Sequence, residues 1–98
     1  MSSDNIMDNL IFEQRPEKQP LVQREGYTIM RITLGKGAMI PPHMANHSAF
    51  FLVLKGRVVF TVGETEIEVR DNQFTSMEAN QMRGIQAVED SIILGVRD

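Results

Sequence analysis

Hydrophobic and polar residues alternate along most of the chain, which is the pattern of β-strands with one buried face. In one such stretch Met30, Ile32 and Leu34 share a face, while Arg31 and Thr33 share the opposite, wetter face. Further strands are predicted over residues 38–40, 49–54, 57–62, 65–69, 73–77, 82–87 and 91–96, separated by turns rich in Gly, Asn and Asp. No stretch of 11 residues has helical periodicity, so the pattern predicts an all-β sandwich or barrel.

The N-terminal part of the chain departs from this pattern. Residues 1–9 are small and polar and predict a weakly structured lead-in, whereas the apolar residues 10–12 could form an edge strand. Pro20 cannot donate a main-chain hydrogen bond, so it also favours an edge position. We therefore predict an N-terminal arm with edge strands over residues 1–26, which pairs with its own sheet or with a partner's, and a barrel over residues 27–98.

Length and composition narrow the class of protein. The 98 residues suffice for one domain with a modest core, and the lack of cysteine excludes disulfides and thiolate metal sites. The net charge is −3, with 10 basic and 13 acidic residues spread along the chain, so we expect neither nucleic-acid nor membrane binding. The sequence has no long apolar run and no signal-peptide pattern, which favours a cytoplasmic location.

A histidine lies between two turn glycines in the first half of the chain. The sequence runs from Gly37 through Pro41 and Pro42, which are expected to stop a short strand, to His43 and then on to Gly56. This stretch resembles the first motif of the cupin family, G(x)5HxH(x)3E(x)6G, in both glycines and in the first histidine.

A second stretch, residues 72–87, fits the frame of the second cupin motif, G(x)5PxG(x)2H(x)3N, with Arg83 at the histidine position. The resemblance covers about residues 27–96. It implies an all-β, cupin-type double-stranded β-helix, or jelly-roll barrel, that is commonly dimeric and holds a ligand or metal site inside.

Most of the family's metal-binding positions hold other residues in this chain. His43 stands at the first ligand position, but Ala45, Ala49 and Arg83 replace the second histidine, the glutamate and the last histidine. A guanidinium group cannot lose its proton in a protein, and its fixed positive charge repels a cation. The resemblance therefore implies that the inherited metal site is lost, and no cofactor is predicted.

His43 and His47 keep a second hypothesis open, because a loop could bring the two side chains together. With an acidic residue that the sequence does not identify, they could serve a divergent metal-dependent enzyme such as an isomerase, dioxygenase or lyase. Two histidines without a third ligand make a weak transition-metal site, so we favour histidines that line a pocket or its rim. The sequence leaves the question of enzymatic activity open.

Arg83 has two interpretations. If the motif register holds, its side chain points into the barrel and could anchor a carboxylate, phosphate or enolate, with His43 as a second donor. Alternatively, it forms an internal ion pair with Glu78 or Glu68 or is exposed at the barrel mouth, as most arginines are paired or exposed.

Small side chains next to an aromatic ring indicate a cavity. Phe51 is expected on the same face as Ala45 and Ala49, which leave room for a ligand. The aromatic cluster Phe50, Phe51, Phe60 and Phe74 is expected to belong mainly to the core. The candidate pocket residues are His43, Ala45, His47, Ala49, Phe51, Met82 and Arg83. The predicted function is that of a homodimeric, metal-free or metal-poor binding or sensor module for a small organic ligand, which is anionic if Arg83 anchors it.

Overall fold

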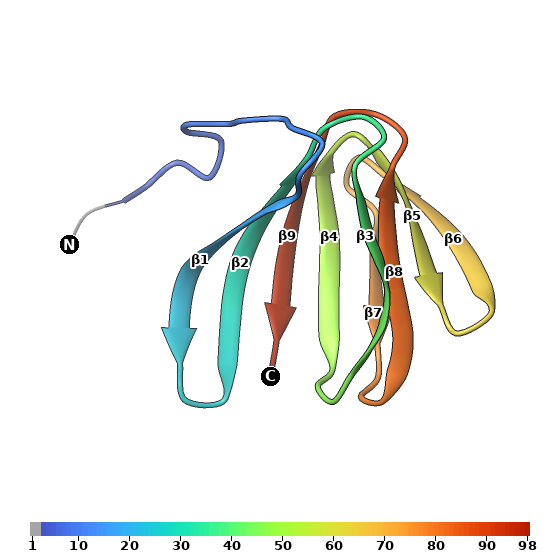
Figure 1. The fold of residues 1–98 in the computed structure, drawn as a ribbon. Helices are drawn as coiled ribbons and strands as arrows, with labels where there is room; N and C mark the ends of the chain where they lie inside the picture. Colours follow the sequence, from blue (N-terminus) through green and yellow to red (C-terminus); the bar gives the residue numbers. More distant parts are fainter. Residues whose placement is uncertain (1–2) are drawn as a thin grey trace.

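Two antiparallel β-sheets form the fold in the computed structural model, which describes residues 3–98 (Figure 1). Within these residues the strands are β1 (Glu17–Arg24), β2 (Tyr27–Leu34), β3 (Met39–Ala45), β4 (Ala49–Lys55), β5 (Arg57–Val62), β6 (Thr65–Arg70), β7 (Phe74–Met77), β8 (Gln81–Ala87) and β9 (Ser91–Arg97). The strand order is β1-β2-β9-β4-β7 in one sheet and β3-β8-β5-β6 in the other. The prediction of an all-β jelly-roll barrel is confirmed, and the described residues include no helix that is long and apolar enough to cross a membrane.

The two sheets face each other across a hydrophobic core. Val53 of β4, Phe60 of β5 and Ile93 of β9 are completely buried between them. Successive side chains of a strand point to opposite faces, so core residues of one strand lie two apart, as Ile32 and Leu34 of β2 do. Burial of one such side chain stabilises the fold by about 1.5–3 kcal/mol.

The sequence predicted that the strand stops at the two prolines that follow Ile40. In the structure, strand β3 continues through them to Ala45. Its register with β8 shifts there, because Ile40 lies opposite Ile85 whereas His43 lies opposite Arg83. Three steps along β3 therefore match two steps along β8, which is a β-bulge. Proline lacks the N–H group that an inner strand needs, but β3 lies at the edge of its sheet, where a bulge tolerates it. The bulge turns His43 back to the inner face.

The N-terminal arm adds an edge strand to the chain's own sheet. Strand β1 pairs with β2 through a hairpin, and its register shifts just after Pro20. The prediction of an edge strand at residues 10–12 is wrong, since these residues form no strand. Instead, this part of the arm crosses to the turn after β2, where the Gly35 amide donates a hydrogen bond to the Glu13 carbonyl oxygen at 2.8 Å.

The sequence pattern predicted that the outer face of β2 is exposed to solvent. In the structure this face is covered. Arg31 is only 4% exposed, and its guanidinium donates hydrogen bonds to the carbonyl oxygens of Ile6, Asp8 and Asn9 at 3.0, 2.5 and 3.4 Å. A buried guanidinium needs acceptors, and the N-terminal segment supplies them. Residues 6–9 of the predicted lead-in are therefore held against the sheet.

The aromatic residues divide between the two faces of the sheet. Phe51 packs against the fully buried Phe60, with ring centroids 5.2 Å apart. Phe50 instead pairs with Phe74 at 5.4 Å on the outer face, where Phe74 is 66% exposed. The expectation that this aromatic cluster belongs mainly to the core is wrong for the second pair, because adjacent strand residues point to opposite faces.

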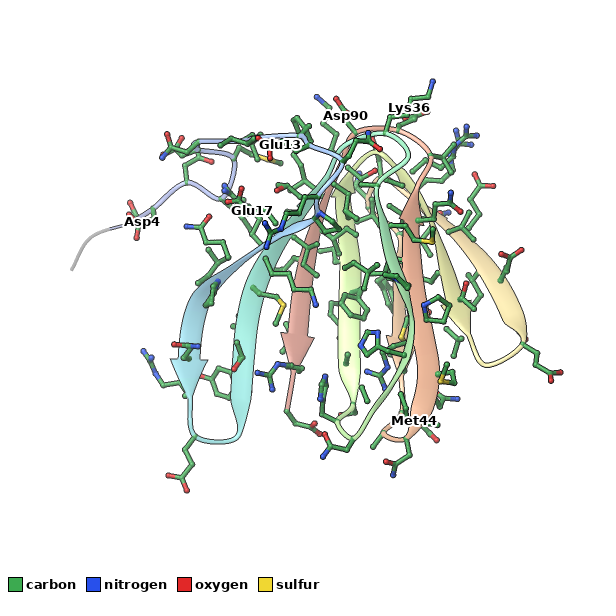
Figure 2. All side chains as sticks on the ribbon, in the orientation of Figure 1. Asp4, Glu13, Glu17, Lys36, Met44 and Asp90 are labelled. Atoms are coloured by element: carbon green, nitrogen blue, oxygen red, sulfur yellow. The ribbon has the colours of Figure 1, made fainter. Side chains whose placement is uncertain are left out.

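Polar contacts hold the turns at one end of the barrel, where Glu13, Lys36 and Asp90 gather (Figure 2). The Lys36 amide donates to the Asp90 carboxylate at 2.8 Å, and the Gln14 side chain donates to the Lys36 carbonyl oxygen at 2.6 Å. These bonds join the arm, the turn after β2 and the turn before β9. Met44 lies at the opposite end of the molecule.

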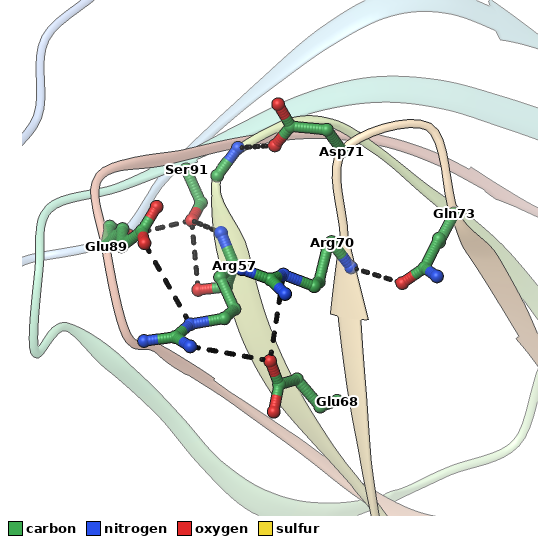
Figure 3. A network of polar contacts seen from close by, with 8 residues as sticks. Arg57, Glu68, Arg70, Asp71, Gln73, Glu89 and Ser91 are labelled. Atoms are coloured by element: carbon green, nitrogen blue, oxygen red, sulfur yellow. Dashed lines mark hydrogen bonds and ion pairs between the residues drawn. The ribbon is translucent and has the colours of Figure 1, made fainter.

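A second polar network lies on the outer side of β5 and β6 (Figure 3). Arg57 lies between Glu68 and Glu89, at 3.7 and 4.0 Å, and Arg70 also contacts Glu68 at 3.9 Å. These side chains are at least one-third exposed, so the pairs contribute little to stability. The carboxylate of Glu68 is thus paired with Arg57 and Arg70, and not with Arg83.

We predict that Gly56→Ala destabilises the protein strongly. Gly56 has a φ of +108°, and a Cβ atom there would overlap the Ser91 hydroxyl and lie 2.5 Å from the Asp90 carbonyl oxygen. Backbone strain and overpacking together are expected to cost about 3 kcal/mol or more in the free energy of unfolding. Urea denaturation measures this loss.

Gly63→Ala is the matched control, because Gly63 has a φ of +62° and nothing within 4 Å of an added Cβ. It should lose only about 1–2 kcal/mol. Equal losses in the two variants would contradict the contact argument.

Candidate functional site

A cavity of about 130 Å³ lies between the two sheets. Side chains from both sheets line it, and the bulged strand β3 and the edge strand β1 each contribute to it. The lining residues are Lys18, Met30, Ile32, Ile40, His43, His47, Ala49, Phe51, Met77, Arg83, Gly84, Ile85, Gly95, Val96 and Arg97. The cavity is thus partly enclosed by apolar side chains and partly bounded by basic ones.

His43 and Arg83 form the cross-strand pair that brings charge to the cavity. They lie directly opposite each other on β3 and β8, so both side chains point to the same face. Gly84 allows the bulge to approach, because a Cβ atom at this position would lie 2.9 Å from the Pro42 nitrogen. The Nδ1 atom of His43 lies 3.2 Å from the Pro41 carbonyl oxygen, to which it donates when it carries the proton.

Arg83 is buried, with an exposed fraction of 5%. Its Nη2 atom donates to the main-chain carbonyl oxygens of His47 and Glu78, at 2.9 and 2.7 Å. These acceptors belong to the loop before β4 and the loop after β7, so one guanidinium joins the two loops. The alternative of an ion pair is wrong, because Arg83 contacts the carbonyl oxygen of Glu78, and the carboxylate of Glu68 pairs with Arg57 and Arg70.

The remaining nitrogen atoms of Arg83 have no acceptor within residues 3–98. Nε and Nη1 are buried, and no group within the described residues accepts a hydrogen bond from either. Each buried N–H without an acceptor costs about 1–3 kcal/mol. The protein therefore carries an unsatisfied positive group beside the cavity, which favours an anionic or carbonyl-bearing occupant.

Three more basic side chains line the cavity besides His43 and Arg83: Lys18 of β1, His47 of the loop before β4, and Arg97 of β9. None of the described lining residues is acidic, although acidic residues outnumber basic ones in the chain. The site thus has a local charge opposite to that of the whole protein, which attracts anions.

The surroundings of His47 lower its pKa from the usual value of 6.5. Burial is the largest cause, followed by the positive charges of Arg97 and Arg83, while Asp98 opposes the shift and His43 adds to it. Both burial and positive neighbours disfavour the imidazolium. His47 is therefore neutral at pH 7 and can accept or donate one hydrogen bond at the cavity.

The loop that carries His47 is fixed by Asp98. The Ser48 hydroxyl donates to one carboxylate oxygen of Asp98 at 2.6 Å, and the Ser48 amide donates to the other at 2.9 Å. These bonds lower the pKa of Asp98, because they favour its charged form. The carboxylate thus supports the cavity rim through Ser48 without lining the cavity itself.

One wall of the cavity is apolar. Phe51 and Met30 lie on either side of Gly95, and a Cβ atom at Gly95 would meet the Phe51 ring at 3.2 Å and Met30 Cγ at 3.3 Å. Glycine at this position therefore leaves room between the two side chains. The sequence analysis did not identify Met30 or Gly95 as site residues, although the inward periodicity of β2 was a signal for Met30.

Five of the seven candidate pocket residues line the cavity: His43, His47, Ala49, Phe51 and Arg83. The other two do not. Ala45 is buried at the end of β3 outside the lining, and Met82 is 39% exposed beside Met44. Met82 precedes Arg83 on the same strand, so the two side chains must point to opposite faces.

The side chains do not fit a metal ion. No group of three His, Asp, Glu or Cys residues that could hold one occurs in residues 3–98. Structural and catalytic zinc sites use at least three protein ligands, and here the guanidinium of Arg83 lines the same cavity as His43 and His47. The donor set therefore favours a negatively charged occupant over a cation.

Comparisons with known proteins agree with this architecture. A family model described as Cupin domain matches residues 30–94. The conserved SPY1581 protein of unknown function from Streptococcus pyogenes is 25% identical, with a TM-score of 0.87, over 98% of this chain and 85% of that chain. An RmlC-like cupin protein from Desulfovibrio desulfuricans is 24% identical, with a TM-score of 0.87, over 99% and 95% of the two chains. The protein TT1209 from Thermus thermophilus is 20% identical, with a TM-score of 0.88, over 99% of this chain and 96% of that chain. No curated protein matches the chain.

We predict that Arg97→Gln raises the pKa of His47 toward 6.5, because it removes the larger of the two arginine charges that act on this imidazole. NMR titration of the imidazole protons measures the pKa, with a His43→Gln variant to assign the signals. Arg24→Gln is the control, since Arg24 is exposed at the end of β1. A pKa of His47 at or above 6.5 in the unmodified protein would contradict the described environment.

The same shift has a consequence for stability. The unfolded chain binds a proton at this histidine near pH 6.5, whereas the folded protein binds it at lower pH. The contribution of neutral His47 is therefore complete above pH 6.5 and is lost as the pH falls toward the folded-state pKa.

Proposed function

Since the chain belongs to the cupin family, as the match over residues 30–94 shows, we propose that it is a binding or sensor module whose barrel holds a small organic anion without a metal ion. The observation that carries this proposal is Arg83. Its buried Nε and Nη1 atoms have no acceptor among the described residues, and its side chain lines the cavity. A carboxylate that accepts from this guanidinium would form a charge-assisted hydrogen bond worth about 1.5–3 kcal/mol.

The size of the cavity supports a ligand of few atoms. An engineered protein cavity of about 150 Å³ binds benzene, which has six non-hydrogen atoms. At about 130 Å³, this cavity suits a group of similar size, such as a carboxylate with a short apolar chain. The apolar wall of Met30 and Phe51 would contact the chain while Arg83 binds the carboxylate.

The alternative function is a divergent metal-dependent cupin enzyme, for example an isomerase, dioxygenase or lyase that uses His43 and His47. Both histidines line the cavity, which is the observation in its favour. The donor set described above gives them no third ligand within residues 3–98 and adds a fixed positive charge beside them. We therefore favour binding over metal-dependent catalysis.

We predict that butyrate, which also has six non-hydrogen atoms, binds the unmodified protein and raises its melting temperature. Arg83→Met should weaken binding about 10- to 100-fold, because it removes the charge-assisted hydrogen bond and keeps only an unbranched apolar side chain that replaces the aliphatic part of arginine. Isothermal titration calorimetry measures the affinity, and circular dichroism checks that the variant is folded.

The control for this experiment is Arg24→Met, which removes an arginine at the exposed end of β1 away from the cavity. It should bind butyrate as the unmodified protein does. If Arg83→Met and Arg24→Met bind butyrate with equal affinity, Arg83 is not the anchor and the proposal fails.

If the protein were a metal-dependent enzyme, a divalent metal ion would bind it and raise its melting temperature. The metal-free module predicts the opposite. We expect that Fe²⁺, Mn²⁺, Ni²⁺ and Zn²⁺, each added to the purified protein, leave the melting temperature unchanged. Stoichiometric metal in the purified protein, lost in a His43→Ala/His47→Ala double variant, would support the enzyme and count against the metal-free module. Elemental analysis of both proteins decides between them.

A further inference from the structure

We propose that the cavity selects a short dicarboxylate, with one carboxylate at Arg83 and the second at Lys18, and this inference rests on the proposed function. The basic side chains of the lining fall into two groups at different positions along the barrel. The first group contains Arg83, His43, His47 and Arg97, and the second is Lys18 alone. A ligand with one negative group uses only the first, whereas a ligand with two uses both.

The first group is close together. Arg83 donates to the carbonyl oxygen of His47, and the charges of Arg83, Arg97 and His43 all act on the His47 imidazole. The positive charge at this end of the cavity is therefore concentrated around His47.

The strand register places Lys18 farther along the barrel. Lys18 lies opposite Ile32 on β2, whereas Arg97 lies opposite Thr28 on the other side of the same strand. Four residues of an extended strand span about 13 Å, which long side chains and a ligand of several atoms can bridge. Ile32 is a core residue, so its cross-strand neighbour Lys18 points to the inner face.

Lys18 also has a structural explanation, because an inward-pointing lysine on an edge strand discourages pairing with other chains. This explanation does not require Lys18 to line a cavity. Here it does line the cavity, together with Ile40 and His43 of β3, the edge strand of the other sheet. No carboxylate of the described residues forms an ion pair with it.

The side chains between the two basic groups determine whether the middle part of the ligand must be apolar or polar. Apart from its basic residues, the lining consists of apolar side chains and glycine. Among the described residues it therefore presents no hydroxyl, amide or carboxylate side chain to a sugar or another polyhydroxylated ligand. Two charged ends joined by a methylene chain match this distribution, because the chain contacts Met30, Ile32 and Phe51 while the carboxylates contact the basic groups.

The experiment compares dicarboxylates with monocarboxylates of the same carbon number by isothermal titration calorimetry. The pairs are succinate with butyrate, glutarate with valerate, and adipate with hexanoate. At low salt the best dicarboxylate should bind about fivefold more tightly than its partner, the gain expected from an ion pair at the exposed Lys18. The advantage should shrink at high salt, because salt screens exposed charges.

Lys18→Met tests the assignment of the second carboxylate. It should remove the advantage of the dicarboxylate and leave the affinity for the monocarboxylate within about twofold, since Lys18 contributes charge only to the second end. Lys55→Met, at an exposed position outside the lining, is the control and should retain the advantage.

The outcomes separate the two proposals. Binding of both series with equal affinity would overturn the dicarboxylate inference and leave the anion-binding function intact. A dicarboxylate advantage that survives Lys18→Met would overturn the assignment to Lys18. Failure of both series to bind the unmodified protein would overturn the proposed function itself, and inorganic phosphate in the same assay reports whether a different anion occupies Arg83.

Discussion

The two hydrogen bonds from Nη2 of Arg83 hold together the end of the barrel that forms the cavity. They connect the loop before β4 with the loop after β7, so one side chain positions both His47 and the wall beside it. The same bonds use only one nitrogen of the guanidinium and leave Nε and Nη1 without acceptors among the described residues. The structure of this end of the barrel and the proposed binding of an anion thus depend on one buried charge, whose burial is tolerated because main-chain carbonyl oxygens stabilise part of it.

This arrangement requires the bulge in β3. An uninterrupted strand would place Ile40 and His43 on opposite faces, since side chains alternate with a period of two. The extra residue at the two prolines brings both of them inside, one in the core and one opposite Arg83. Gly84 completes the arrangement because it gives the bulged backbone room to approach β8. The histidine–arginine pair is therefore a product of edge-strand geometry.

Sequence reasoning could predict the strands, the barrel and the position of Arg83 inside it, because local alternation and motif spacing determine them. It failed where distant parts of the chain meet. The hydrogen-bond acceptors of Arg31 come from residues 6–9, and the sequence of β2 and its neighbouring turns does not indicate them. Lys18 and Arg97 reach the cavity through strand pairings that one sequence does not specify, and the sequence left open whether the arm pairs with its own sheet or with a partner's. The error at Met82 was avoidable, because alternation with Arg83 already places it outside.

Strand β1 has a neighbour on one side only within the described sheet, and none of its residues belongs to the hydrophobic core of the described part of the chain. Such edge elements open locally at lower free energy than the whole fold. A ligand held between Lys18 and Arg83 would link this edge to the most buried charge in the cavity. Occupancy of the proposed site would then appear at the arm as slower hydrogen exchange along β1.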